Sequence, residues 1–492
     1  MPYHRLSLVV FFFLSGVAAT VTQVTAEQRL NVLMICVDDL KPVLGCYGDA
    51  TAKSPNVDRL AKRGLLFQAA YCNQAVCSPS RNALMTGLRP QTLGIYDLAT
   101  NFRASRPEAV TVAQQFRRHG YQTQSLGKIF HTGHGNIDDE ASWSVPSWRP
   151  KAPTYRLPAS TALPAKPKGN GPKGTATESA DVGDSEYGEG QLADELILRL
   201  DAAAKSSSPF FIAGGFIRPH LPFVAPKKYW DFYDADELPM PAITTPPEGA
   251  PSYAPQFGGE LRSYSDMPDQ GLLTDAETRK LIHGYYAATS YMDAQLGRVL
   301  DRLDALNLWD TTIVLLWGDH GWHLGDHGMW CKHTNYEQAT RIPFMIAAPK
   351  FAAGVTTKAM METVDIYPTL CELTGLPIPA GLDGKSFVNV IKSPTSSARE
   401  TVTHVYPRNA LLGRSIRDER YRMVEWKKPG NEQSTAEIEL YDYELDSLET
   451  KNIATERPEI VSKLRKILAQ QPEAKPQINA KAKTKAKSAS KK

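Results

Sequence analysis

The sequence has neither the large excess of positive charge typical of nucleic-acid-binding proteins nor, beyond its N-terminus, the long apolar stretches typical of membrane-spanning proteins. Its 492 residues carry a formal net charge of only +3. This balance gives no reason to expect a nucleic-acid partner, because such partners are bound through a clear excess of positive charge. Beyond the N-terminal segment, no stretch is long and apolar enough to span a membrane, which takes about 20 residues. The sequence predicts about two or three globular domains, no nucleic-acid partner and no stable membrane anchor.

Cysteine is also scarce. The chain has six cysteines, and none of them forms a C-x-x-C pair. Six cysteines in a chain of this length do not make a disulfide scaffold. The sequence leaves open whether any two of them pair; they are Cys36, Cys46, Cys72, Cys77, Cys331 and Cys371.

The N-terminus has the layout of a secretory signal peptide. His4 and Arg5 precede an apolar run from 6 to 19, and the small residues at 24–26 suit a cleavage point. We expect residues 1–26 to be removed and the protein to be secreted or periplasmic. A retained anchor is the alternative, but the apolar run is shorter than the ~20 residues of a spanning helix.

The stretch around which the rest of the chain is organised is Cys77-Ser-Pro-Ser-Arg81. Pro79 suits the first turn of a helix, where its missing N–H costs nothing. Cys77 would then lie at the helix N-terminus, which favours an anion, and Arg81 would lie on the same face one turn later. The pattern indicates a sulfur nucleophile at an anion-binding helix start. A buried free cysteine is the alternative reading of so short a motif.

A pair of carboxylates follows the first predicted strand. Leu30–Val37 is a short continuous apolar run, typical of a strand buried on both faces, and Asp38 and Asp39 come directly after it. Ligands of open α/β sheets bind beyond the carboxyl ends of strands. Two adjacent carboxylates there suit a hard cation, whereas an isolated pair is more often part of a loop or a helix cap.

Three further strand-like segments are followed by polar residues that can do chemistry. Histidine suits proton transfer because its ordinary pKa lies near neutrality, although a lone lysine or histidine after a strand is often only a surface or packing residue. The residues are Lys128 and His131 after the segment that begins at Gly120, His220 after Pro209–Phe216, and Asp319 and His320 after Thr311–Trp317.

Taken together, these motifs resemble those of the type I sulfatases, which belong to the alkaline phosphatase superfamily. The likeness is greatest to the iduronate-2-sulfatase branch and covers roughly residues 31–454. The matching stretches are C-S-P-S-R with L-M-T-G-L-R-P (residues 77–81 and 84–90), G-Y-x-T-x-x-x-G-K-x-x-H (120–131), R-P-H-x-P-F (218–223), G-D-H-G (318–321), W-C-K (330–332) and E-L-Y-D-Y-E-L-D (439–446).

The resemblance implies a modified cysteine and a metal ion. Cys77 would be oxidised to 3-oxoalanine (formylglycine) by a formylglycine-generating enzyme during maturation. One Ca²⁺ ion would be held by the modified residue 77 together with the residues at two strand ends. His320 could instead contact the sulfate, because calcium prefers oxygen ligands. The implied metal set is Asp38, Asp39, Cys77, Asp319 and His320.

The resemblance also implies a mechanism for cleaving a sulfate ester. Formylglycine hydrates to a geminal diol, one hydroxyl attacks sulfur, and the second collapses back to the aldehyde and releases sulfate. His220 would protonate the leaving sugar oxygen. The remaining groups, Arg81, Lys128, His131 and Lys332, would supply positive charge and hydrogen bonds.

The predicted fold class is α/β, with a large mixed sheet between helices and a small C-terminal α+β subdomain. We expect a catalytic domain over 27–393, with a poorly ordered low-complexity insertion at 142–184, which either shapes specificity or is a solvated loop. The subdomain should cover 394–472. A disordered Lys-rich tail should follow at 473–492 and either bind polyanions or aid solubility.

The expected substrate is a sulfated carbohydrate, with a 2-O-sulfated uronic acid as one possibility. Two other functions remain open at this point. One is hydrolysis of phosphodiesters or phosphonate monoesters, which relatives with the same nucleophile motif perform. The other is a non-catalytic protein that binds polyanions in the same cationic pocket without oxidation of Cys77.

Overall fold

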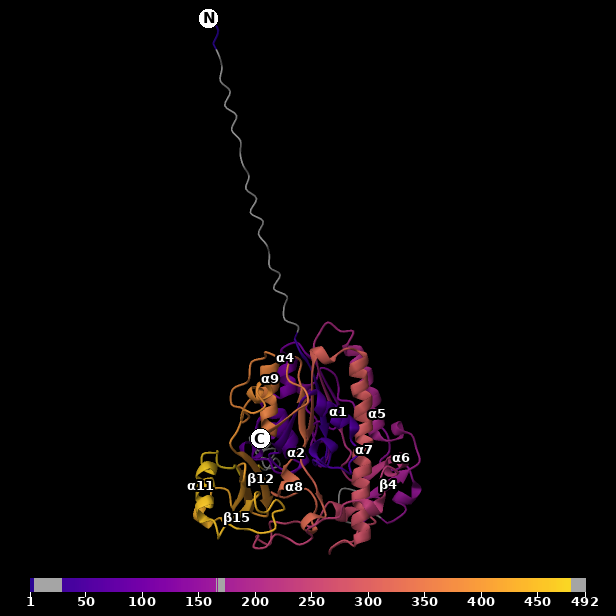
Figure 1. Cartoon of the computed structure of the whole chain (residues 1–492), viewed down its shortest axis with the longest axis vertical. Coiled ribbons are helices and arrows are strands. Elements are labelled where there is room, and N and C mark those ends of the chain that lie inside the picture. Colours follow the sequence, from indigo (N-terminus) through magenta and orange to yellow (C-terminus); the bar gives the residue numbers. More distant parts are fainter. Residues whose placement is uncertain (4–28, 165, 167–172, 479–492) are drawn as a thin grey trace, which may run out of the picture.

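The computed structural model describes residues 1–3, 29–164, 166 and 173–478. It contains a large mixed sheet between layers of helices and a small C-terminal sheet that carries one helix (Figure 1), which confirms the predicted fold class. Nearly all of the predicted signal peptide and the last residues of the tail lie outside the described residues. None of the helices in the described ranges combines the length and apolar character needed to cross a membrane.

The large sheet has seven strands in the order β11-β2-β10-β7-β1-β5-β3. Four neighbours, β7, β1, β5 and β3, run parallel, so their carboxyl ends meet at one edge. β10 runs antiparallel to β7 and β2. The strands are β1 (Asn31–Val37), β2 (Leu65–Tyr71), β3 (Gln122–Gly127), β5 (Phe210–Phe216), β7 (Thr312–Gly318), β10 (Phe344–Ala347) and β11 (Val355–Glu362).

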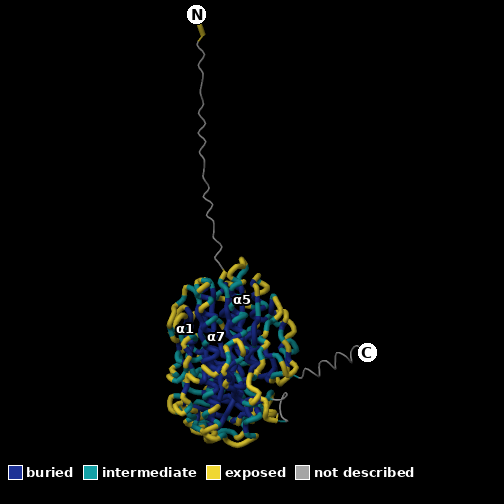
Figure 2. Tube along the Cα trace, turned by 90° about the vertical axis from the view of Figure 1, so that its right-hand side faces the viewer, coloured by how far each residue is buried: buried dark blue, intermediate teal, exposed yellow. Residues whose placement is uncertain are grey.

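Helices cover both faces of this sheet (Figure 1). One face packs against α1 (Pro55–Arg63), α5 (Gly188–Ala203) and α7 (Asp275–Ala305). The other face packs against α2 (Cys77–Thr86), α4 (Val112–Arg118) and α9 (Ile366–Leu373). The central strands β1, β5 and β7 are therefore buried on both faces, and buried residues fill the interior of the molecule (Figure 2). This explains their continuous apolar runs.

The long helix α7 starts at a capping box and serves mainly as core. The Thr274 side chain accepts from the Glu277 N–H, and the Glu277 side chain bonds back to Thr274. The apolar residues that recur along it at three- and four-residue spacing are all buried: Leu281, Tyr285, Ala288, Met292, Leu296, Val299 and Leu303.

The C-terminal subdomain is an antiparallel sheet in the order β12-β13-β14-β15. Its strands are Val402–Arg408, Leu411–Arg417, Tyr421–Lys427 and Glu437–Asp442, and α11 (Pro458–Leu468) packs on it. The shorter elements of the chain are α3 (Pro90–Leu93), α6 (Lys227–Trp230), α8 (Glu337–Thr340), α10 (Val388–Lys392), β4 (Thr177–Ala180), β6 (Phe223–Pro226), β8 (His323–Leu324) and β9 (Trp330–Cys331).

The expected insertion differs from the prediction over its described residues, 142–164, 166 and 173–184. It contains β4, which pairs in parallel with β6. The Glu178 side chain on β4 is buried and accepts hydrogen bonds from the backbone N–H groups of Arg156 and Leu157 and from the Ser160 and Tyr187 hydroxyls. One satisfied buried carboxylate therefore orders a loop whose composition indicated disorder.

The start of the tail also differs from the prediction. Glu473 forms ion pairs with Arg414 and Lys427 of the subdomain. Further on, the Lys475 N–H donates to the Gln91 carbonyl and the Ile478 N–H donates to the Gly94 carbonyl. The chain up to residue 478 therefore packs back onto the catalytic domain instead of starting a disordered tail at 473.

Candidate active site

Four parallel strands bring the predicted site residues to one edge of the sheet. β1 is followed by Asp38 and Asp39, β7 by Asp319 and His320, β3 by Lys128, and β5 by the loop that carries His220. Backbone hydrogen bonds tie these strand ends together: the Asp38 N–H donates to the Phe216 carbonyl and the Asp319 N–H to the Val37 carbonyl, both at 3.1 Å. The convergence follows directly from the parallel register.

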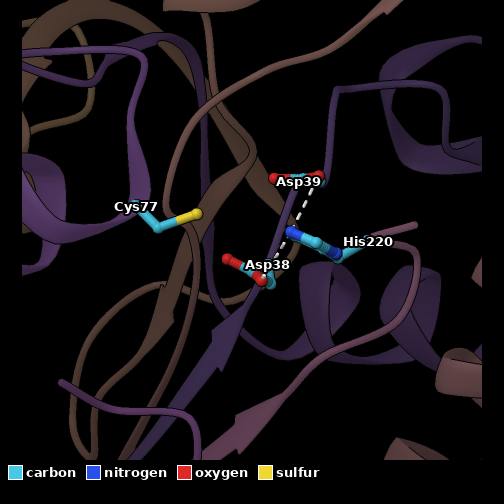
Figure 3. A group of neighbouring side chains, drawn as sticks. All are labelled: Asp38, Asp39, Cys77 and His220. Carbon is cyan, nitrogen blue, oxygen red and sulfur yellow. Dashed lines mark ion pairs between the residues drawn. The ribbon is translucent and has the colours of Figure 1, made fainter. Parts of the chain in front are cut away.

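The nucleophile motif lies at a helix start, as predicted. Cys77 is the first residue of α2, and its Sγ points into the cluster of carboxylates (Figure 3). Sγ lies 3.4 Å from His320 Nε2 and 3.6 Å from Lys128 Nζ. Burial, together with the Asp38 charge, raises the pKa of the thiol to about 12 against the opposing effects of Lys128 and Lys332. An unmodified Cys77 is therefore a neutral thiol at neutral pH and a weak nucleophile.

Arg81 holds two of the carboxylates in place. Its guanidinium is fully buried, with Nη2 3.0 Å from Asp38 Oδ1 and Nε 2.9 Å from Asp319 Oδ2. Burial alone would raise the pKa of Asp38, but Lys128 and Arg81 hold that pKa well below its usual range. Arg81 therefore neutralises both carboxylates and fixes their positions. Its removal would leave buried negative charge without compensation.

A second ionic group links Lys332 to the site. Lys332 Nζ lies 3.1 Å from Asp39 Oδ1 and Oδ2 and 2.8 Å from Glu260 Oε2. Glu260 Oε1 in turn lies 3.2 Å from His220 Nε2. The sequence reasoning missed Glu260, because it lies in a proline- and acid-rich loop with no periodic pattern.

His220 faces the carboxylates with one defined nitrogen. Its Nδ1 donates to the Leu221 carbonyl, which can only accept, so any additional proton is carried by Nε2. Nε2 lies 4.0 Å from Asp38 Oδ2 and 3.8 Å from Asp39 Oδ2 (Figure 3). Burial, assisted by Lys332, lowers the pKa of His220 to about 4, and Glu260 opposes this shift.

His320 presents a lone pair to the same cluster. Its Nδ1 donates to the Gly321 carbonyl at 3.1 Å, which leaves Nε2 as an acceptor. Nε2 lies 3.3 Å from Asp39 Oδ1 and 3.5 Å from Asp319 Oδ1. A histidine whose other nitrogen donates to a backbone carbonyl is the arrangement found in metal ligands.

The residues present therefore fit a divalent cation. Ligand atoms of Asp38, Cys77, Asp319 and His320 lie within 4.8 Å of one another, and so do those of Asp38, Asp39, Cys77 and His220. Burial raises the pKa of Asp39 well above its usual range even though Lys332 lies beside it. A bound cation would offset that cost, and three carboxylates match the oxygen donors that calcium prefers.

Some of these side chains, Cys77 among them, line a cavity of about 420 Å³, within the range of small-molecule sites. His131 lies in its wall, and His131 Nε2 is 3.2 Å from His134 Nδ1. Within the described structure His131 Nδ1 is buried without a hydrogen-bond partner. The wall also contains residues that the sequence did not indicate: Lys173, Gly259, Ser263 and His333, besides His134 and Glu260.

Residues from outside the cluster fix the loops that carry it. The Tyr285 hydroxyl on α7 donates to the Asp39 carbonyl and accepts from the Lys41 N–H, which supports the positive φ of 58° at Asp39. On β12, His404 Nε2 accepts from the Ala75 N–H at 2.9 Å, two residues before Cys77. The small subdomain therefore helps to hold the loop that precedes Cys77.

Comparison with known proteins agrees with this geometry. The profile of the sulfatase family matches residues 30–376, and a profile described as N-sulphoglucosamine sulphohydrolase, C-terminal, matches residues 325–474. Iduronate 2-sulfatase from Mus musculus is 35% identical over 389 residues, which cover 72% of this chain and 70% of that protein. The Homo sapiens protein is 35% identical over 405 residues, covering 74% and 72%.

Among solved structures, the phosphonate monoester hydrolase SpPMH from Silicibacter pomeroyi superposes with a TM-score of 0.73. The superposition covers 90% of this chain and 95% of that one, at 22% sequence identity. Likeness at this level of identity concerns the fold alone.

Proposed function

The chain belongs to the sulfatase family and is a sulfuric ester hydrolase, and we propose that it removes sulfate from a sulfated glycan, with a 2-O-sulfated uronic acid as the residue acted on. The substrate proposal draws on the relatives named iduronate 2-sulfatase, which match about three quarters of the chain. It also draws on His220, which lies in the R-P-H-x-P-F segment.

The observation that carries the proposal is the meeting of Cys77 with a complete set of charged groups in one cavity. Three buried carboxylates, the Nε2 lone pair of His320, and the ammonium groups of Lys128 and Lys332 surround the sulfur. A sulfate ester needs a nucleophile, neutralisation of its oxygens and a proton donor for the leaving oxygen. Each need has a residue in this cavity.

When residue 77 carries the aldehyde hydrate and a calcium ion is bound, they supply an oxygen nucleophile and a Lewis acid. Lys128 holds the side chain of residue 77 and balances negative charge beside it. Lys332, which lies in the same cavity wall, binds a sulfate oxygen. Before substrate binds, His220 Nε2 carries no proton at neutral pH, because burial lowers the pKa of His220 to about 4 and Nδ1 holds the remaining proton. The negative charge of a bound sulfate ester raises that pKa, so that Nε2 takes up a proton. As the S–O bond breaks, Nε2 gives this proton to the leaving sugar oxygen, which becomes a hydroxyl group.

Maturation and location form part of the proposal. Residues 1–26 direct the chain to a secreted or periplasmic location. A formylglycine-generating enzyme oxidises Cys77 before the protein becomes active. A tryptic peptide that contains residue 77 reports this change directly, because the aldehyde has a different mass from the thiol.

The test measures sulfate release from a defined panel of substrates, with calcium present or chelated. The panel holds a disaccharide that ends in a 2-O-sulfated uronic acid, glycans sulfated at other positions, an aryl sulfate and an aryl phosphodiester. Calcium-dependent release from the uronic acid supports the whole proposal. Release only from another glycan would overturn the substrate, and faster turnover of the phosphodiester than of every sulfate would overturn the reaction.

A further inference from the structure

The positive charges closest to Cys77 are already paired with carboxylates. Arg81 pairs with Asp38 and Asp319, and Lys332 pairs with Asp39 and Glu260. Lys128 pairs with Asp38 and lies beside Cys77. These groups neutralise the cluster and the scissile sulfate, which leaves them little free charge for a second anion on the substrate.

Lys173 differs from these cations in its partners. It lines the same cavity, and its Nζ lies 4.6 Å from the centre of the Tyr264 ring. Among the described residues it forms no ion pair with a carboxylate. An ammonium group beside an aromatic face, with no carboxylate partner, remains available to an anion that enters the cavity.

The backbone next to Lys173 is held firmly against the loop that forms the other side of the cavity. The Gly174 carbonyl accepts from the Ser265 N–H at 3.0 Å, and the Ala176 N–H donates to Asp266 Oδ1 at 2.7 Å. At Gly174 a Cβ would lie 2.2 Å from the Ser160 carbonyl oxygen, so only glycine fits there. Lys173 therefore leaves the chain from a defined point at the cavity.

We propose that Lys173 is a specificity residue that binds a second anionic group of the glycan while the scissile sulfate lies at residue 77. That group is a sugar carboxylate or another sulfate, and both have the charge that a lysine ammonium binds. The inference rests on the proposed function of the cavity. It assigns the 142–184 insertion a role in substrate choice through one side chain.

The test compares Lys173→Met with Lys151→Met, an equal loss of charge at an exposed position of the same insertion. For a disulfated disaccharide that also has a uronic carboxylate, Lys173→Met should raise KM at least about tenfold, because a charge-assisted hydrogen bond is lost. For a small aryl sulfate, which has no second anion, kcat/KM should match that of Lys151→Met. Lys173→Arg should restore most of the affinity for the disaccharide.

A carboxyl-reduced disaccharide and a disulfated one separate the two anions. If the carboxylate is the partner, its reduction removes the difference between Lys173→Met and the control; if a second sulfate is the partner, the difference remains only for the disulfated sugar. Equal KM values for both variants on every anionic sugar would overturn the proposal.

A direct measurement of binding makes this test independent of turnover. In a Cys77→Ala background, calorimetric titration with the same disaccharides gives a dissociation constant without reaction. Weaker binding by Lys173→Met supports the subsite even if wild type releases no sulfate from that disaccharide. The absence of sulfate release would count against the proposed substrate alone. Unchanged binding would overturn the subsite while leaving the sulfatase activity untouched.

Discussion

Among single residues, His220 has the role that the geometry defines most narrowly. Its Nδ1 proton is held by the Leu221 carbonyl, and Nε2 faces the cavity between Glu260 and the carboxylates after β1. A proton for the leaving oxygen can therefore be carried only by Nε2, in the imidazolium form that a bound sulfate ester favours. This geometry leads to a prediction that depends on the leaving group.

Replacing His220 by Ala should slow release of sulfate from a sugar by about 10²–10⁴-fold, the usual contribution of a general acid. The loss should be far smaller for the sulfate ester of an acidic phenol, because the phenolate leaves without a proton. Measuring kcat for both esters gives the comparison, with His119→Ala, directly after α4 and away from the cavity, as the control. Equal losses for both esters would contradict the assignment.

The sequence allowed most of the site to be predicted at this scale, because each residue follows a predicted strand, lies in the C-S-P-S-R motif or, like Lys332, lies in a stretch that resembles the family. Five of the predicted residues line one cavity, and the others contact these five or one another. Their catalytic roles stay predictions until they are tested. Glu260, His333 and Lys173 could not be predicted, because their loops carry no periodic pattern and only tertiary packing brings them to the cavity.

At the level of elements, Glu362 joins the two sheets. It ends β11 and is almost fully buried; its carboxylate accepts from Arg89 Nε at 2.7 Å and from the Thr403 N–H of β12 at 2.8 Å. Burial would raise the pKa of Glu362, but Arg399 and Arg89 lower it to about 2. A carboxylate with a depressed pKa stabilises the fold above its unfolded-state pKa, and this stability is lost as pH falls toward 2.

Glu362→Gln should therefore lower the free energy of unfolding at neutral pH by on the order of 3 kcal/mol. The difference from wild type should shrink as pH falls from about 4.5 toward 2, where wild type also loses the charge. Urea unfolding at several pH values measures it. Glu456→Gln, which removes a carboxylate exposed beside Lys451, should change little. A pH-independent difference would contradict this account.

The long helices and the central strands were predictable, because α7, β1, β5 and β7 have strong periodicity or long apolar runs. β2 and β11 were not predicted. β2 follows α1 after a single glycine, Gly64, and a short apolar run cannot be assigned by periodicity alone. The order around Glu178 could not be predicted either, because composition does not reveal a buried hydrogen-bond network.

On the scale of the whole molecule, the carboxylate cluster couples metal binding to stability. A ligand that binds only the folded state stabilises it, by about 2.7 kcal/mol at a concentration 100 times its Kd. Calcium should therefore raise the melting temperature, and a chelator should lower it. Asp319→Asn should remove this calcium-dependent difference, whereas Asp301→Asn, at an exposed ion pair, should keep it. Identical melting of wild type with calcium and with chelator would contradict a calcium site.

The most direct test of the account concerns residue 77 in the intact protein. The measurement is sulfate release from one aryl sulfate by wild type and by Cys77→Ala, with melting curves recorded for both. We predict that Cys77→Ala lowers the rate at least about a thousandfold, because the nucleophile is removed, while the melting temperature stays close to that of wild type. A folded Cys77→Ala protein that releases sulfate at a rate close to that of wild type would contradict the central claim that residue 77 carries the reaction.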